Sequence, residues 1–309
     1  MILVAGSANL DFVVRAARIP GPGETVLGHG FETFAGGKGA NQACACARAG
    51  GVPTRFLGAM GSDTFANPIE DSLRQAGVVL DVVRAPHDKT GTAFICVSDD
   101  AENAITVAPG ANQYLQPHHM PDFSGISHLL MQLEVPLPTV AAYALQAHAQ
   151  GVCVVLNAAP MQALPDTLLD CIDVLIVNEG ELRALAGTHG SIAQCLQRIG
   201  VPTVIVTLGP RGCLARERGT MYVQPAFAIT AVDTTGAGDT FCGTLVAALS
   251  QGFPLPDALR HASAAGALAC TRHGAQTSVP AASEVQALAA QGAVACTVEA
   301  LQAYCGVEP

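Results

Sequence analysis

Short runs of apolar, often β-branched residues alternate along most of the chain with longer stretches in which apolar residues recur at helical spacing. The apolar runs predict strands at residues 2–6, 54–59, 128–133, 153–157, 174–177 and 204–207. The helical spacing predicts helices at residues 40–49, 67–76, 138–148, 191–199 and 238–249, with further helix after Pro280. Apolar strands separated by helices are typical of a parallel sheet covered on both faces. The sequence therefore predicts a doubly wound α/β fold that binds ligands at the carboxyl ends of its strands.

Two segments depart from this rhythm. Residues 10–34 alternate apolar and polar positions around the turn IPGPGET, and residues 92–107 do so around the turn DDAEN. Such alternation around a polar turn is typical of antiparallel, half-buried strands. Because no linker, low-complexity tract or internal repeat is present, we expect a single domain of residues 1–309. Segments at about 10–34 and 90–108 would add a small β-sheet lid to its mostly parallel sheet.

Composition narrows the class of protein. A net charge of −10 over 309 residues argues against nucleic acids and anionic membranes as partners, because both attract clustered Lys and Arg. No apolar run has the length of a membrane span, and the opening MILVAGSANLDF lacks a basic leader. The eleven cysteines are scattered without a C-x-x-C pair, as expected of buried thiols in a reducing compartment. We therefore expect a cytoplasmic protein.

The stretch AVDTTGAGDTF places glycines directly before an apolar helix. The N–H groups of Gly236, Ala237 and Gly238 can converge there, and the helix N-terminus adds positive partial charge, which together form an anion site. Asp239 would lie in the first helical turn, where its carboxylate stays ionised and can accept a proton from an alcohol that attacks a phosphoryl group. The simpler interpretation is an ordinary aspartate behind a glycine loop.

Two familiar phosphate-binding loops do not fit this chain. The dinucleotide fingerprint G-x-G-x-x-G would need glycine in place of Phe241. The P-loop would need glycine at Glu32 and serine or threonine at Gly39. A nicotinamide-dependent dehydrogenase is therefore disfavoured.

A second glycine cluster, FAGGKGANQACACARAG, surrounds Lys38 with Gly36, Gly37 and Gly39 and is followed by Asn41. Glycines permit close approach of the backbone to a ligand, and Lys38 and Asn41 can then bond its hydroxyl groups, which suits a sugar. A Gly-rich turn with a solvated lysine and Asn41 as a helix N-cap is equally consistent with the pattern.

Polar residues also follow two of the predicted strands. Asn9 and Asp11 lie two apart, so on an extended chain their side chains share a face and can grasp neighbouring hydroxyl groups; an Asx turn is the alternative. Glu134 follows the run HLLMQL and is either a further acceptor in the pocket or a surface charge.

Two later motifs point to the nucleotide. NEGE, residues 178–181, fits a capping box at a strand-to-helix junction, and its groups could also orient a Mg²⁺–phosphate shell through waters. TLGPRG, residues 207–212, is a glycine turn that forms either one wall of a nucleotide pocket or a hairpin.

In this order, GGKGANQA, NEGE, TLGPRG and DTTGAGDTFCG resemble the ribokinase (PfkB-type) family of carbohydrate kinases, over about residues 2–280. The resemblance implies a doubly wound domain with a small β-sheet lid, often paired as a homodimer, that transfers phosphate from Mg²⁺-bound ATP to a sugar. GETV and the GAQ-x-SVP of residues 274–280 are most similar to the members that phosphorylate the 5-hydroxyl of ribose.

The resemblance also implies residue roles. Asp239 matches the catalytic base of the family, and Gly236, Ala237 and Gly238 match the residues that form its anion hole. The sugar-binding positions are Asn9, Asp11, Gly37, Lys38, Asn41, Glu134 and Asp239. The nucleotide positions are Asn178, Thr207, Leu208, Gly209, Gly212, Gly238 and Ser263, and Glu181 matches a position that contacts Mg²⁺ through water. The family also binds a monovalent cation, usually K⁺. The positions that match this cation site are Asp233, Thr235, Ala269, Arg272, Gly274 and Ser278, several of which contribute only backbone carbonyls.

Some positions depart from the family pattern. Ser263 stands where these kinases often carry a histidine near the adenine, and Pro210 stands where a smaller polar residue is common. Both departures bear on the affinity for the nucleotide. The acceptor also stays open between ribose and a nucleoside, 2-deoxyribose, fructose or a ketodeoxy acid, and a non-catalytic sugar sensor is a further alternative.

Overall fold

The computed structural model describes residues 1–100, 102–291 and 293–307. Four residues lie outside this description: Ala101 in the predicted DDAEN turn, Gly292 in the predicted C-terminal helical stretch, and Glu308 and Pro309.

The main sheet contains nine strands, and most neighbouring strands are parallel. In spatial order they are β13 (Thr220–Pro225), β12 (Gly212–Glu217), β11 (Thr203–Thr207), β10 (Val174–Asn178), β9 (Cys153–Asn157), β8 (His128–Met131), β1 (Ile2–Ala5), β4 (Thr54–Met60) and β5 (Val79–Arg84). In the described part of this sheet, the only antiparallel pairs are β11–β12 and β12–β13, at one edge.

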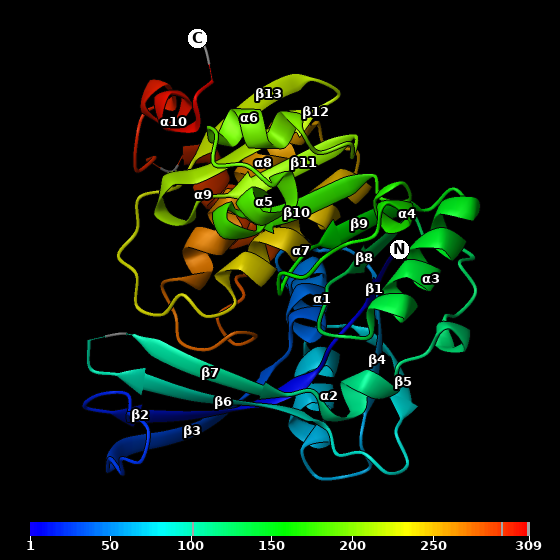
Figure 1. Ribbon diagram of the computed structural model, residues 1–309, viewed down its shortest axis with the longest axis vertical. Helices are drawn as coiled ribbons and strands as arrows, with labels where there is room; N and C mark the ends of the chain where they lie inside the picture. The colour runs from blue at the N-terminus through cyan, green and yellow to red at the C-terminus, as the bar shows by residue number, and fades with distance from the viewer. Residues whose placement is uncertain (101, 292, 308–309) are drawn as a thin grey trace.

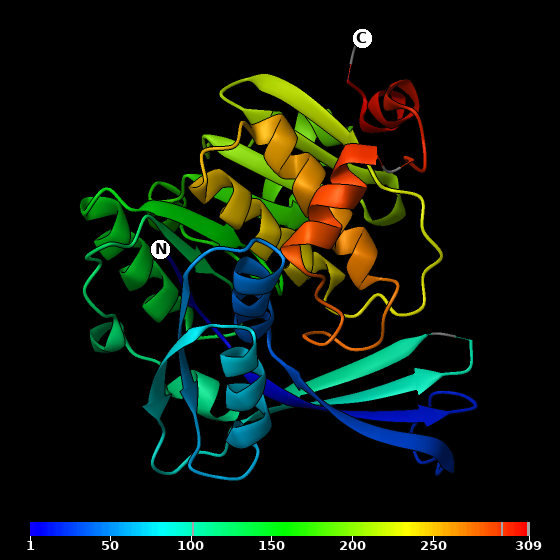
Figure 2. The ribbon, with the colours of Figure 1, turned by 180° about the vertical axis from the view of Figure 1, so that it is seen from behind.

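Helices cover both faces of this sheet (Figures 1 and 2). One layer, in front in Figure 2, contains α1 (Lys38–Arg48), α2 (Ala66–Gln75), α7 (Ala237–Ser250), α8 (Leu255–Ala269) and α9 (Ala282–Gln291). The other layer contains α3 (Leu137–Ala149), α4 (Asp166–Leu169), α5 (Glu179–Ala186), α6 (Ile192–Gln197) and α10 (Val298–Cys305). Successive residues of β1 divide between the two cores: Ile2 and Val4 pack into the first, Leu3 and Ala5 into the second. The predicted doubly wound fold is confirmed.

The predicted strands correspond to β1, β4, β8, β9, β10 and β11, with ends within about two residues of the prediction. Three strands were not predicted: β5, β12 and β13. They lie at the two edges of the sheet, where polar side chains interrupt the apolar pattern. Short 3₁₀ turns complete the fold at η1 (Gly110–Tyr114), η2 (Pro117–His119) and η3 (Gly209–Arg211).

A separate sheet of four strands projects from the main body and is seen at the bottom of Figure 1. Its spatial order is β3 (Gly28–Gly36), β2 (Asn9–Ala16), β6 (Gly91–Ser98) and β7 (Asn103–Ala108). The pairs β2–β3 and β6–β7 are antiparallel, as predicted, and β2 joins β6 in parallel. We refer to these four strands as the small sheet.

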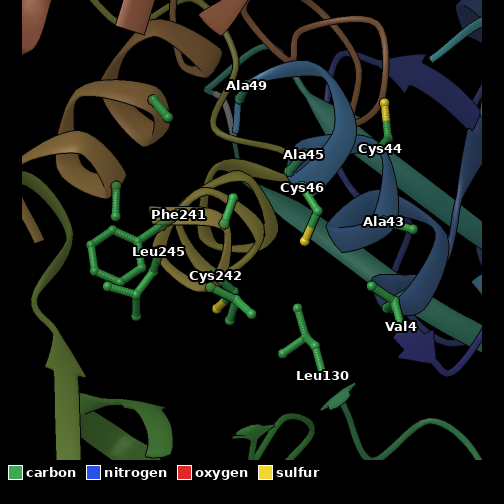
Figure 3. Packing of buried hydrophobic residues seen from close by; sticks show 14 of the residues in the cluster. Val4, Ala43, Cys44, Ala45, Cys46, Ala49, Leu130, Phe241, Cys242 and Leu245 are labelled. Carbon is green, nitrogen blue, oxygen red and sulfur yellow. The ribbon is translucent and has the colours of Figure 1, made fainter. Parts of the chain in front are cut away.

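Helices α1 and α7, which follow the two glycine motifs, pack closely against each other. A Cβ atom on Gly243 of α7 would lie 2.5 Å from the Gln42 carbonyl oxygen and 2.6 Å from the Ala45 Cβ, both in α1. Cys46 donates a hydrogen bond from Sγ to the Gly243 carbonyl at 3.3 Å. Figure 3 shows Ala45 and Cys46 beside the turn of α7 that carries Cys242. Small residues at this contact therefore bring the ends of the two motifs together.

All eleven cysteines are free thiols and seven of them are buried, as the sequence predicted. Among the described residues, no helix has both the length and the apolar character that a membrane crossing requires.

Candidate active site

Three cavities adjoin around the loop that precedes α7. A cleft of about 550 Å³ separates the small sheet from the main body and is lined by Asp11, Phe34 and Ile95 on one side and by residues 231–235 on the other. A cavity of about 190 Å³ reaches Lys38 and Asp239, and a largely apolar cavity of about 780 Å³ lies against α8. Thr234 lines the first and third cavities, and Gly238 lines the second and third. The start of α7 is therefore where the three spaces meet.

The first turn of α7 presents backbone N–H groups at this meeting point. Gly236 has φ +72°, and a Cβ atom there would lie 2.9 Å from the Ala275 Cα, so both the conformation and the space favour glycine. The Thr240 N–H closes the first helical bond onto the Gly236 carbonyl at 2.8 Å, which leaves the earlier N–H groups without an acceptor in the helix. The Ala237 N–H donates to the Thr234 carbonyl oxygen at 3.3 Å. This turn has the form of an anion site.

Asp239 lies in the same first turn and is 8% exposed. Its Oδ1 accepts a hydrogen bond from Gln42 Nε2 and its Oδ2 from Asn41 Nδ2, each at 2.9 Å. Asn41 is not the cap of α1: that position is Gly37, with φ +87°, and Asn41 follows in the first turns of the helix. The interpretation of Asn41 as an N-cap is therefore wrong, and the two glycine motifs meet through its side chain.

Lys38 begins α1, where the charges of nearby carboxylates act on its ammonium group. The charge of Asp239, more than any other group, raises the pKa of the Lys38 ammonium, and Glu134 adds to the effect. Glu134 Oε2 accepts hydrogen bonds from Ser7 Oγ at 2.6 Å and from the Lys38 N–H at 3.1 Å. Glu134 is thus half-buried against the N-terminus of α1 and is not a free surface charge.

Asp11 lies on β2, on the face of the small sheet that lines the cleft. Burial and the charges of Glu134 and Asp239 raise the pKa of its carboxyl to about 7, against the opposing influence of Lys38. A Cβ atom on Gly36 would lie 2.1 Å from Asp11 Oδ2, so this glycine makes room for the carboxylate. Asp11, Glu134, Lys38 and Asp239 therefore form one coupled group of charges.

Asn9 begins the same strand, so the alternative of an Asx turn at Asn9 and Asp11 is wrong. Its Oδ1 accepts a hydrogen bond from Asn112 Nδ2 at 2.8 Å, and Asn112 also bonds both backbone groups of Ala8. Asn9, Gly37 and Glu134 are not among the residues that line the three cavities; they lie just behind those that do.

Cys242 also lines the cavity beside Asp239. Burial, followed by the charge of Asp239, holds the pKa of its thiol well above the usual range. A neutral thiol is a poor nucleophile, so the carboxylate is the reactive group of this cavity.

NEGE forms the capping box that the sequence predicted. Asn178 Oδ1 accepts from the Glu181 N–H and Glu181 Oε2 accepts from the Asn178 N–H, both at 2.8 Å. Burial raises the pKa of Glu181, while the Asn178 hydrogen bond and Lys38 limit the rise. Both side chains line the cavity that contains Asp239.

TLGPRG forms a hairpin, and four of its residues also line a cavity. Its residues join β11 to the antiparallel strand β12, with the Leu208 N–H bonded to the Gly212 carbonyl at 2.8 Å. The largely apolar cavity against α8 is lined by Thr207, Gly209, Pro210 and Gly212, and Leu208 is buried behind them. Ser263 of α8 lines the same cavity, with its Oγ 3.8 Å from Cys213 Sγ.

The positions matched to a monovalent cation lie at the end of α8 and on two adjoining loops, one before α7 and one after α8. Asp233 Oδ1 accepts from the N–H and the hydroxyl of Thr235, at 2.9 and 2.7 Å, and its Oδ2 accepts from the Gly274 N–H at 3.0 Å. Burial opposes ionisation of Asp233, but these hydrogen bonds outweigh it and hold the pKa of the carboxyl below its usual value. The Arg272 guanidinium is directed to Glu284 of α9. Ala269 and Ser278 are fully buried, and the Ser278 hydroxyl donates to the Ala275 carbonyl at 3.0 Å.

Several contact residues of this site were not identified from the sequence. They are the amides Gln42, Asn112, Gln132 and Asn157 and the hydroxyl of Ser7, all of them buried. The available signal was a polar side chain within an apolar run, such as Gln132 in HLLMQL and Asn157 at the end of CVVLN.

Solved structures share this architecture over nearly the whole chain. The crystal structure of ribokinase from Thermotoga maritima matches with a TM-score of 0.86 and 34% identity, covering 94% of this chain and 99% of that one. The structure of Arabidopsis thaliana ribokinase complexed with ribose and ATP matches with a TM-score of 0.86 and 35% identity, covering 93% and 98%. Fold and site together define a phosphotransferase that uses an alcohol group as acceptor.

The sequence comparisons identify the family. A ribokinase from Haemophilus influenzae is 37% identical over 291 residues, which is 90% of this chain and 95% of that protein. The family model for the pfkB family carbohydrate kinases matches residues 1–282. The chain belongs to the pfkB family of carbohydrate kinases.

Proposed function

We propose that this protein is an ATP-dependent sugar kinase that phosphorylates the 5-hydroxyl of ribose. The observation that carries the proposal is the position of Asp239, a buried carboxylate at the N-terminus of α7, where the sugar-side cleft adjoins the two cavities on the nucleotide side. Similarity to ribokinases, one of them complexed with ribose and ATP, supports ribose as the acceptor.

In the proposed reaction, the sugar hydroxyl attacks the γ-phosphorus of ATP while Asp239 accepts the hydroxyl proton. The new P–O bond forms as the bond to the bridging oxygen breaks, and ADP leaves with the electron pair of that bond. The N–H groups of Gly236, Ala237 and Gly238 and the N-terminus of α7 stabilise the transferring phosphoryl group. The small sheet closes over the sugar as a lid and excludes water, which limits hydrolysis of ATP.

The proposed sugar ligands are Asn9, Asp11, Gly37, Lys38, Asn41 and Glu134. Asp11 and Lys38 line the cavities, and Asn41 already contacts Asp239, which supports their direct contact with the sugar. Asn9, Gly37 and Glu134 lie behind them, so small movements of the lid would have to bring them to the ligand. On the nucleotide side, the proposed walls of the ATP site are formed by Asn178, Thr207, Gly209, Gly212, Gly238 and Ser263, and Leu208 supports them from behind.

Two cations complete the proposal. No group of three or more metal-binding side chains lies among the described residues, which suits Mg²⁺ that arrives with the phosphates and meets Glu181 through water. Bound there, Mg²⁺ would neutralise charge on the phosphates. By the family resemblance, the second cation would be K⁺, bound by Asp233, Thr235, Ala269, Arg272, Gly274 and Ser278. The Arg272 guanidinium is directed away to Glu284, and the other atoms that this set offers are oxygens, which suit a hard cation.

A substrate panel tests the proposed function. Purified protein is incubated with Mg²⁺-ATP and with ribose, 2-deoxyribose, fructose, a ketodeoxy acid or adenosine, and ADP release is followed by a coupled assay. We expect the highest kcat/KM with ribose and a product phosphorylated on its 5-hydroxyl. A higher kcat/KM for a nucleoside or a hexose would contradict ribose as the substrate, and absence of ADP release with every acceptor would favour a sugar sensor.

Binding of ribose should depend on pH through Asp11. Hydroxyl groups donate to the ionised carboxylate, whose pKa in the free protein is about 7, so protonation below that pH competes with binding. Calorimetric titration with ribose should show a Kd that rises about tenfold between pH 8 and pH 6. In the Asp11→Asn variant, binding should be weaker and should not vary over this range. A wild-type Kd that is equal at pH 6 and pH 8 would contradict this role.

We also propose that the protein is a cytoplasmic homodimer joined through the small sheet. The face opposite the cleft carries Phe12 stacked on Phe31 and Phe94, with centroid distances of 6.2 and 5.4 Å. Phe31 and Phe94 are 63% and 54% exposed, an unusual amount of aromatic surface. A partner that covers this face would bury those rings.

The homodimer can be tested with charged substitutions on this face. Phe31→Glu and Phe94→Glu should convert the dimer to a monomer in sedimentation velocity, because each places a charge in the apolar contact. Leu145→Glu is the matched control: Leu145 is 61% exposed on α3, outside the small sheet, and its variant should stay dimeric. Monomeric wild-type protein would refute the proposed assembly.

A further inference from the structure

A chain of buried amide side chains leads from the main sheet to Asp239. Gln42 Nε2 donates to Asp239 Oδ1 at 2.9 Å and to Asn157 Oδ1 at 3.0 Å, and Gln42 Oε1 accepts from Gln132 Nε2 at 2.6 Å. Gln42 and Gln132 are 0% exposed. Neither lines any of the three cavities, and neither is among the proposed ligands of the sugar or the nucleotide.

The partners of Gln42 determine the orientation of its amide group. Asn157 donates from Nδ2 to the Ile176 carbonyl at 3.2 Å, so its Oδ1 faces Gln42 as an acceptor. An ionised carboxylate only accepts hydrogen bonds, so Gln42 must present its NH₂ group to Asp239. Gln132 follows β8 and Asn157 ends β9, so residues at the carboxyl ends of two neighbouring strands hold this amide, and Ile176 of the next strand, β10, orients Asn157.

We infer that Gln42 is a positioning residue for the phosphoryl transfer, and that it holds the Asp239 carboxylate in the orientation that receives the proton. This inference rests on the proposed function. Asn41 donates to the other oxygen of Asp239 but is also a proposed sugar ligand, so it would have to serve two partners when the sugar binds. Gln42 has no such second role, and its contact persists through the reaction. A shift of a catalytic group by about 1 Å lowers rates by as much as roughly 10²-fold, so a fixed anchor has a large effect.

Methionine is the appropriate replacement, because it keeps the length and unbranched shape of glutamine and removes the N–H donor. Gln42→Met should lower kcat for ribose by roughly tenfold or more, with KM within about threefold of wild type. Gln132→Met, which loses only the contact that orients Gln42, should give a smaller decrease in kcat. Gln224→Met is the matched control: Gln224 is a buried glutamine of β13 that bonds the Pro225 carbonyl, and its variant should keep the wild-type kcat.

The decisive comparison is a double-mutant cycle with Asp239→Asn. If Gln42 acts through Asp239, Gln42→Met should change the residual kcat of Asp239→Asn by less than about twofold, whereas a merely structural defect would lower both backgrounds equally. Melting temperatures verify that each variant is folded, and if Gln42→Met does not fold, Gln132→Met decides in the same cycle. An unchanged kcat in wild-type background, or equal losses in both backgrounds, overturns the inference. If the wild-type protein turns over none of the panel sugars, the proposed function fails and the inference fails with it.

Discussion

Asp239→Asn should fold and lose at least about 10²-fold in kcat with ribose, the scale expected for removal of a general base. Asparagine has the shape of aspartate and keeps an oxygen that can accept one of the two hydrogen bonds from Asn41 and Gln42. It cannot take up the proton of the attacking hydroxyl. Steady-state kinetics from the coupled ADP assay, with thermal unfolding as the measure of stability, checks the prediction.

The Asp239→Asn result separates catalysis from binding. The KM for ribose should change much less than kcat, because the lost function belongs to the transition state. Asp257→Asn, at an exposed position in the first turn of α8, is the matched control and should have wild-type kcat. Near-normal turnover by Asp239→Asn would refute its role as the base.

Gly243→Ala should destabilise the protein by about 1–3 kcal/mol and lower kcat by roughly tenfold. The added Cβ would lie 2.5 Å from the Gln42 carbonyl oxygen and 2.9 Å from the Cys46 N, both backbone atoms of α1, so the helices must separate. Separation moves Asn41 and Gln42 away from Asp239. Alanine usually favours a helix over glycine by about 1 kcal/mol, which offsets part of the loss. Urea unfolding and the coupled assay give the two quantities.

Gly200→Ala serves as the control for this substitution. A Cβ atom on Gly200 would meet no heavy atom within 4 Å, and its φ lies outside the left-handed region, so stability and kcat should both stay close to wild type. If Gly243→Ala is as stable and as active as Gly200→Ala, the close contact of α1 and α7 is not what holds the two motifs together.

The sequence predicted the buried part of the fold better than its edges. β1, β8, β9 and β10 are buried on both faces and therefore read as continuous apolar runs. β12 and β13 lie at an edge and carry Arg216, Glu217 and Gln224, so their composition resembled that of a loop. The parallel pairing of β2 with β6 joins segments about 80 residues apart, and local alternation contains no information about such pairing.

The sequence likewise predicted only part of the candidate site. The glycine motifs revealed Asp239, Lys38 and Asn41, because glycine beside charge is conspicuous in a chain with 13% charged residues. Their contacts were hidden, because Gln42 looked like any polar residue on a helix until α1 was placed against α7. The elevated pKa of Asp11 likewise arises from Glu134 and Asp239, which are distant in sequence. Long-range charge and hydrogen bonding require the folded coordinates.

The most direct test of the proposed roles of Asp239 and the start of α7 is a crystal structure of the protein with ribose and a non-hydrolysable analogue of Mg²⁺-ATP. We expect the 5-hydroxyl oxygen of ribose within about 2.6–3.2 Å of a carboxylate oxygen of Asp239, and the γ-phosphate on the N–H groups of Gly236, Ala237 and Gly238. A complex in which Asp239 contacts only Asn41 and Gln42, with the hydroxyl and the phosphate bound elsewhere, would contradict the role of Asp239 as the base.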